Sequence, residues 1–381
     1  AVDGDTGMIP AGTCTINIPI YVKQKILIIQ GAGIDQTTFV DNVPKSYCST
    51  GVSVNGETIY ACSPLVVNTK DGGLTRVTSM TFNGGNPSGI KSEGLLVING
   101  SSKTWRVDNI RFNNTSLWGI SVYGFTYGLI DHNIFNLQLG NEAFFGIHTE
   151  HDSWNGQLYG DGSWADAAYF GTEKAIYIED NTFTMAGNNQ GYAHDGWSGG
   201  RVVFRHNTLN RTTYANHGTE SAGRWRGERS YEIYDNTFDM TGVGTSFPDV
   251  IGIRSGNGVI FNNTALGAPS DVVRFATLNT YRAQLSFDPW GKCDGTSVWD
   301  QNMSGQSGYA CIDQVGRGQG DLLTGFTPIN TTTGTAAWPH QVVEPIYVWN
   351  NTLRGIPAGA VSIASQIQEN RDFYHSSKPN Y

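Results

Sequence analysis

A short phrase ending in asparagine recurs along the chain and constrains its fold more than any other feature. Its strict copies end at Asn133, Asn181, Asn207, Asn236, Asn263 and Asn351. A looser copy reads Val107-Asp108-Asn109-Ile110-Arg111-Phe112, and most steps between copies are 24 to 29 residues long. A repeat of this length, with a strand in each unit, predicts a solenoid.

Alternating apolar runs precede the phrase, as in RVVFRHN, AIYIEDN and SYEIYDN, and they predict strands with one buried face. Such units bury that face only by stacking on the next copy. Asparagine at equivalent positions can form an amide ladder along the stack and tolerates the left-handed turn conformation. The 48 Gly and the charged fraction of only 15% also favour β structure rich in turns. We therefore expect an all-β fold, a parallel β-solenoid, in which His132 and His206 are turn residues.

The spacing also predicts how the chain is organised. We expect residues 1–381 to form one parallel β-helix domain, with an insertion at about 150–172 and a long excursion at about 277–345. Cys48 and Cys62 are near enough in the sequence to form a disulfide that closes one loop, and Cys293 and Cys311 could close another in the same way. Cys14 then has no predicted partner. Disulfides and a start at Ala1 without a leader favour a processed, secreted protein.

Three stretches give the chain a family resemblance: the DNTF-type phrase, the opening IPAGT…ILIIQGAG and the closing ENRDFY at 369–374. In these the chain resembles the pectate-lyase-like right-handed parallel β-helix superfamily over roughly residues 10–370. That superfamily consists mostly of secreted polysaccharide lyases, glycoside hydrolases and uronate epimerases, with some phage tailspikes and adhesins. The resemblance implies right-handed coils and a carbohydrate ligand bound along the outside of one parallel sheet.

A second alternating strand follows each asparagine phrase and predicts where the site lies. If Ile120, Ile147, Ala193, Asn216, Ile253 and Val273 face inward, alternation turns one residue of each strand outward into a column. That column is Ser121, His148, His194, His217, Arg254 and Arg274. Successive coils lie about 4.8 Å apart, and folding alone does not require stacked like charges. We therefore take His148, His194, His217 and Arg254 as candidate catalytic residues.

Further polar and aromatic residues are expected beside this column. The candidate substrate-binding residues are Arg274, Glu150, Glu220, Arg224, Trp154, Trp197, Trp225, Tyr192, Tyr214 and Asp195. Aromatic faces stack on the apolar C–H faces of sugar rings. The insertion leaves its coil beside His148, so we expect it to wall a cleft.

This set of side chains suits a lyase that cleaves a uronic-acid-containing polysaccharide by β-elimination. Arg254 and Arg274 would neutralise the uronate carboxylate, and His194 or His217 would act as the base. Tyr192, Tyr214 or the remaining histidine would supply the acid. The chain lacks the Asn-Thr-Asp and Asp-Asp motifs of polygalacturonase-type hydrolases and the Arg-x-Pro-x-x-Arg of pectate lyases. Neither activity therefore carries over residue by residue.

The same residues also allow other functions. A glycoside hydrolase needs a carboxyl pair, available as Glu150 with Glu220 or as Asp195 with either. A uronate C5-epimerase would use the same histidines and arginines, and a non-catalytic solenoid of the adhesin or tailspike kind would only hold a glycan.

We expect no cofactor, although Ca²⁺ bridging carboxylates remains open. A zinc site of His148, His194 and His217 is disfavoured, since equal spacing holds the outer two backbones about 10 Å apart. The net charge of −9 argues against nucleic acid as a partner, and no apolar run of about 18 residues suggests a membrane span. The expected partner is a polysaccharide substrate, bound by a monomer.

Overall fold

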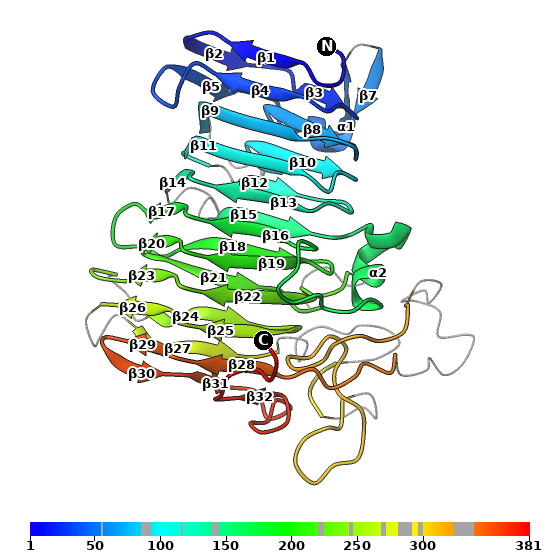
Figure 1. The fold of residues 1–381 in the computed structure, drawn as a ribbon, viewed down its shortest axis with the longest axis vertical. Coiled ribbons are helices and arrows are strands. Elements are labelled where there is room, and N and C mark those ends of the chain that lie inside the picture. The colour runs from blue at the N-terminus through cyan, green and yellow to red at the C-terminus, as the bar shows by residue number, and fades with distance from the viewer. Residues whose placement is uncertain are drawn as a thin grey trace.

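The computed structural model describes residues 1–54, 56–84, 93–115, 117–138, 145–219, 225–243, 247–267, 272–280, 292–295, 300–323 and 339–381, and the structural statements below concern these residues. Short strands stack in parallel along one long axis, with the N terminus at one end and the C terminus beside β28 near the other (Figure 1). The chain is a parallel β-helix, and the predicted fold class is confirmed.

One face of the stack is a parallel sheet, here called sheet B, which carries the column predicted above. Its strands in spatial order are β3 (Ile20–Lys23), β8 (Leu65–Thr69), β10 (Leu96–Gly100), β12 (Trp118–Val122), β15 (Phe145–Glu150), β18 (Gly191–Trp197), β21 (Thr212–Asn216), β24 (Phe247–Ile253), β27 (Val272–Leu278) and β31 (Ala360–Ser362).

The other large sheet, sheet A, has two rows of strands that meet at the asparagine turn. The first row is β1 (Thr6–Ile9), β4 (Ile28–Gly31), β9 (Thr75–Gly84), β11 (Trp105–Asn113), β13 (Gly128–Asp131), β16 (Ile176–Glu179), β19 (Arg201–Arg205), β22 (Ser230–Tyr234), β25 (Asn257–Phe261), β28 (Ile346–Trp349) and β32 (Phe373–Tyr374). The second row is β2 (Gly12–Ile16), β5 (Thr37–Asp41), β14 (Ile134–Leu137), β17 (Thr182–Met185), β20 (Thr208–Asn210), β23 (Thr237–Asp239), β26 (Thr264–Leu266) and β29 (Asn351–Leu353), on which β30 (Ile356–Ala358) folds back antiparallel. The long strands β9 and β11 pair with strands of both rows.

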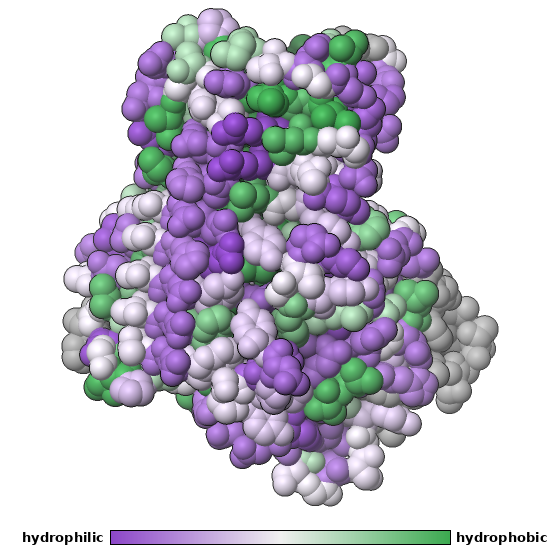
Figure 2. All heavy atoms as spheres, viewed as in Figure 1, coloured by the Kyte–Doolittle hydropathy of each residue, from purple (hydrophilic) through white to green (hydrophobic). Residues whose placement is uncertain are grey.

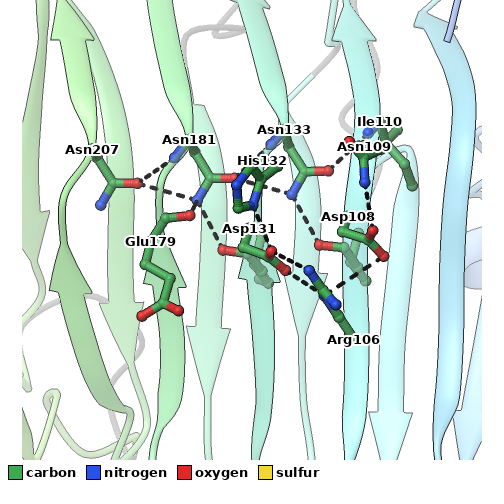
Figure 3. Close-up of polar contacts among 12 residues, drawn as sticks. Arg106, Asp108, Asn109, Ile110, Asp131, His132, Asn133, Glu179, Asn181 and Asn207 are labelled. Carbon is green, nitrogen blue, oxygen red and sulfur yellow. Dashed lines mark hydrogen bonds and ion pairs between the residues drawn. The ribbon is translucent and has the colours of Figure 1, made fainter.

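The recurring asparagines form a buried ladder at the turn between the two rows, as predicted. The backbone N–H of Asn181 donates to Oδ1 of Asn207 at 3.0 Å, and the same bond recurs from Asn133 to Asn181 (Figure 3). The amide nitrogen of Asn207 also donates to the carbonyl oxygen of Ile178 at 2.8 Å. The residue before each ladder asparagine adopts the left-handed conformation, with φ of 56° at His132 and 55° at His206. Both histidines are turn residues, as predicted.

The looser copy of the phrase is displaced by one residue from its predicted alignment. Ile110 stands at the ladder position and donates its backbone N–H to Oδ1 of Asn133 at 3.0 Å. Asn109 takes the left-handed position, with φ of 51°, and lies in register with His132. The asparagine at 109 therefore serves the turn conformation rather than the ladder.

Stacked rings and ion pairs continue the ladder on either side of the turn. Inside the helix, Phe112 stacks on Phe135 with centroids 4.9 Å apart, and Phe135 on Phe183 at 4.6 Å. Outside it, Arg106 pairs with Asp131 at 2.6 Å (Figure 3). Figure 2 shows a band of hydrophilic residues running lengthwise along the stack, as expected when equivalent positions of successive coils are in register.

Two long segments interrupt the coils on one side of the stack (Figure 1). Residues 151–175 form the insertion and contain η1 (Trp154–Gly156), η2 (Leu158–Gly160) and α2 (Asp161–Trp164). The described parts of the excursion between β27 and β28 pack against it, since the backbone N–H of Gly320 donates to the carbonyl of Trp164. Near the N terminus, α1 (Tyr47–Thr50) precedes a hairpin of β6 (Val52–Val54) and β7 (Glu57–Ile59).

Both predicted disulfides are present. Cys48 is bonded to Cys62, and Cys293 to Cys311, whereas Cys14 is an exposed free cysteine. None of the helices in the described part of the chain has the length and apolar character needed to cross a bilayer.

Candidate functional site

A cleft of about 410 Å³ lies on the outer face of sheet B, over β15 to β27. We call it the sheet B cleft. Five predicted site residues line it, namely Asp195, His217, Arg254, Tyr192 and Tyr214. It is also lined by Phe145, Gln190, Ala215, Asp249, Gly252, Ile253, Thr277 and Asn279.

The predicted outward column is wrong at His194, and the strand register also places His217 and Arg254 two residues beyond the row that contains Ser121 and His148. A bulge between Tyr192 and His194 places His194 beside Ile147, on the inner row of the sheet, where it is fully buried and stacks on Tyr214 with centroids 4.6 Å apart. Because one extra residue reverses which side chains face out, Asp195 rather than His194 lies beside His148. Burial lowers the pKa of His194 to about 3, so its imidazole is neutral.

His148 lies on the outward row as predicted, but aromatic rings cover it. Its side chain is 1% exposed, stacks under Trp118 at 4.3 Å and meets the edge of Trp197 at 5.5 Å. Its Nε2 lies 2.8 Å from Oε1 of Glu150, which is itself nearly buried. These two residues form a packed pair beside the cleft and do not line it.

His217 and Asp195 form the central pair of the cleft. Nε2 of His217 lies 3.0 Å from Oδ1 of Asp195, and the His217 side chain is 20% exposed. Burial by itself would raise the pKa of Asp195, but the contact with His217 and the charges of His148 and Arg254 outweigh it and hold that pKa at about 2. Asp195 is therefore ionised at neutral pH and fixes the imidazole ring of His217.

Arg254 lies beside His217, because Ala215 pairs with Gly252 two residues earlier on the neighbouring strand. Its Nε donates to the carbonyl oxygen of Asn216, and its backbone N–H donates to Oδ1 of the same residue, both at 2.7 Å. Asn216 thus fixes both the backbone and the guanidinium of Arg254. Asn216 faces inward, as predicted.

A buried carboxyl, Glu228, lies beneath the cleft and was not predicted. It accepts hydrogen bonds from the Tyr214 hydroxyl at 2.9 Å and from the Asn216 amide at 2.8 Å. Burial raises its pKa to about 8, although those two bonds act in the opposite direction. Glu228 belongs to no repeat phrase, and no pattern in the sequence points to it.

Asp249 is a second carboxyl of the cleft that sequence reasoning missed. It lies in register with Arg274, and burial raises its pKa. Strict alternation puts Asp249 on the same side as the core residue Ile251, yet it lines the cleft. Alternation could therefore not have found it. The predicted place of Arg274 in one column with Arg254 is wrong, because Arg274 is in register with Asp249 on the neighbouring strand. Arg274 is half-buried and does not line the cleft itself.

The predicted aromatic residues divide into two groups. Tyr192 lines the cleft, half-buried, and stacks on Phe145 at 5.1 Å, while Trp197 meets His217 at 4.8 Å. In contrast, Tyr214 is fully buried and Trp154 is 1% exposed, so neither presents a face to a sugar. Trp225 is half-buried against Tyr159 and does not line the cleft.

The expectation that the insertion walls the cleft is not met. Its residues lie against the coils on another side, where Trp164 donates to the carbonyl of Gly227 and Asp161 contacts Arg226, and none of them lines the cleft. The predicted residues Glu220 and Arg224 lie outside the described residues.

The predicted histidine set does not converge, because His194 faces the interior while His217 faces the cleft. Within the described ranges, no group of three or more His, Cys, Asp or Glu side chains has the arrangement of a metal site.

No family model and no curated protein sequence matches the chain. Among solved structures, it is similar to an alginate lyase from Paenibacillus sp. strain FPU-7 at 12% identity, over 98% of this chain and 92% of that one, with a TM-score of 0.29. It is also similar to the catalytic domain of a GH87 α-1,3-glucanase in complex with tetrasaccharides, at 14% identity, over 98% of this chain and 64% of that one, with a TM-score of 0.32. At this identity and TM-score neither activity is carried over to the present chain.

Proposed function

We propose that the protein is a secreted, monomeric polysaccharide lyase that cleaves a uronic-acid-containing polymer by β-elimination in the sheet B cleft. The observation that carries the proposal is the Asp195–His217 pair with Arg254 on the adjoining strand, in a cleft lined by Tyr192. An imidazole oriented by a carboxylate, a guanidinium and a phenol are three kinds of group that can carry out β-elimination of a uronate.

His217 is the proposed base. Its contact with the ionised carboxylate of Asp195 orients the ring and stabilises the imidazolium that forms when it takes a proton. The proton comes from C5 of the uronate, and its electron pair forms the C4=C5 double bond as the bond from C4 to the glycosidic oxygen breaks.

Arg254 is the proposed partner of the uronate carboxylate. Neutralising that carboxylate stabilises the negative charge that builds up when C5 loses its proton. Asn216 accepts one hydrogen bond from the guanidinium and another from the backbone N–H of Arg254, so little reorganisation accompanies the reaction.

Tyr192 is the proposed acid that protonates the leaving oxygen. It replaces Tyr214 in that role, because the Tyr214 hydroxyl is buried and donates to Glu228. His194 is likewise excluded as the base by its burial.

The test is a panel of polysaccharides, followed by the ultraviolet absorbance of an unsaturated uronate and by a reducing-end assay in parallel. We expect His217→Ala and Arg254→Ala to lower turnover by roughly 100-fold or more, as general acid–base and electrostatic groups do. The matched control is His206→Ala, an exposed histidine of the asparagine turn, which should leave turnover unchanged. Full turnover in both site variants would overturn the proposal, and binding without any turnover in the wild type would favour a non-catalytic glycan-binding protein.

One observation supports a second candidate, a glycoside hydrolase. The cleft contains two carboxyls whose pKa values are displaced in opposite directions: that of Asp195 is held at about 2, whereas burial raises that of Asp249. An ionised and a protonated carboxyl together are the pair that a hydrolase uses. This candidate predicts new reducing ends without unsaturated product, and loss of activity in Asp249→Asn.

A further inference from the structure

A second cavity, of about 400 Å³, lies near the N-terminal end of sheet B. We call it the N-terminal groove. It is lined by Tyr21, Thr58, Ile59, Tyr60, Ala61, Val66, Asn68, Glu93, Val97, Asn99, Tyr123 and Asp152.

The groove and the sheet B cleft share one face of the molecule. One outward row of the sheet runs from Val66 and Val97 in the groove through Ser121 and His148 to Asp195 in the cleft. Val97 and Asp195 are three strands apart, which is about 15 Å. A single polymer lying along the sheet can therefore occupy both places.

The groove offers rings and uncharged polar groups. Tyr60 is 64% exposed, and the half-buried Tyr21 accepts a hydrogen bond from the Asn68 amide at 3.4 Å. Asn99 lies beside Asn68 on the next strand. Aromatic rings and amides placed together in a concave site are the groups that bind the C–H faces and hydroxyls of sugars.

The described lining residues of the groove include carboxyls without the basic side chains, Arg254 and His217, that accompany the carboxyls of the cleft. Glu93 and Asp152 line it, and none of its described lining residues is a lysine or an arginine. Burial, with the nearby charge of Glu150, raises the pKa of both carboxyls. A substrate carboxylate placed in the groove would be repelled by the carboxyls of Glu93 and Asp152. In the cleft, by contrast, Arg254 and His217 would attract a substrate carboxylate.

We propose that the N-terminal groove binds neutral sugar units of the same chain whose uronate unit lies in the sheet B cleft. The substrate is then a heteropolysaccharide that combines uronic acid with neutral sugars, not a homopolyuronate. This inference rests on the proposed function for the uronate in the cleft, but the groove can be tested without turnover.

The first experiment measures binding by calorimetry to the His217→Ala variant, with cellohexaose, mannohexaose and xylohexaose as neutral probes and hexagalacturonate as the anionic probe. We expect at least one neutral probe to bind, and Tyr60→Ala to weaken it by roughly tenfold. Tyr309→Ala, an exposed tyrosine outside the groove, is the matched control and should bind normally. If no neutral probe binds, or if Tyr60→Ala binds as tightly as the control, the inference is wrong.

The second experiment tests the charge of the groove with the double variant Glu93→Gln/Asp152→Asn. Removing two carboxylates should strengthen hexagalacturonate binding by roughly threefold or more at low salt, with less gain at high salt. Neutral-probe binding should not weaken. Unchanged hexagalacturonate binding at low salt would contradict the inference. Neutral binding without any unsaturated product would instead refute the lyase proposal and leave the groove intact.

Discussion

At the scale of single residues, the burial of Glu228 makes the stability of the folded protein depend on pH. It is fully buried, and its Oε2 accepts the bonds from Tyr214 and Asn216, while its Oε1 lies 3.8 Å from Nε2 of His194. Because burial raises its pKa from 4.5 to about 8, the folded protein holds a proton there that the unfolded chain releases. The stability that this protonated carboxyl contributes is complete below about pH 4.5 and is lost as the pH rises through about 8.

We therefore expect Glu228→Gln to keep wild-type stability at pH 5 and to become more stable than the wild type at pH 8, because glutamine stays neutral in the same shape. Urea unfolding at pH 5, 7 and 8 measures this. The contrasting variant is Glu228→Ala, which strands the Tyr214 hydroxyl and the Asn216 amide and should be less stable at pH 5 and 7. Equal pH slopes for Glu228→Gln and the wild type would contradict the assignment of a protonated carboxyl.

At the scale of elements, the asparagine ladder fixes the turn between the two rows of sheet A. Asn207 accepts the backbone N–H and the amide of Asn181 and donates to the carbonyl of Ile178. Substituting alanine leaves these buried groups without partners, at a cost of about 1–3 kcal/mol for each group.

We expect Asn207→Ala to lower the free energy of unfolding by about 2–4 kcal/mol, measured by urea denaturation. The matched control is Asn136→Ala in β14, a half-buried residue whose amide donates to Asn113. It should lose about 1 kcal/mol or less, since water replaces the lost bond. If both variants lost similar amounts of unfolding free energy, the buried ladder bonds would stabilise the protein no more than the half-buried ones.

The same elements show what the sequence can predict. Ladder asparagines sit at equivalent places in successive coils from Asn133 onward, so their spacing predicts the solenoid, its turns and the presence of an insertion after Asn133. The outward row of sheet B has no such marker. Its prediction assumes strict alternation, and one extra residue at Ala193 moves His194 inside and brings Asp195 out. Hence His217 and Arg254 could be predicted to face out, whereas the Asp195–His217 contact and Asp249 could not.

At the scale of the whole molecule, one buried arginine joins three distant parts of the chain. Arg226 contacts Asp161 of the insertion at 3.3 Å and Asp313 of the excursion at 2.6 Å, and all three side chains are fully buried. Charge balance therefore couples the insertion, the coil after β21 and the excursion.

Removing the arginine leaves two buried carboxylates facing each other without a cation. We expect Arg226→Met to destabilise the protein by about 3–5 kcal/mol. Limited proteolysis with mass spectrometry should then show new cleavage in residues 151–175 and 300–323. Adding Asp161→Asn and Asp313→Asn to the same chain removes the unpaired charges and should restore much of the stability. The control is Arg211→Ala, a half-buried arginine whose guanidinium donates, among the described residues, to the carbonyl of Met185. This variant should keep the wild-type digestion pattern. Because the sheet B cleft has no lining residue from the insertion, a partly unfolded Arg226→Met protein that still binds hexagalacturonate would show that the coils hold the cleft without help from the insertion.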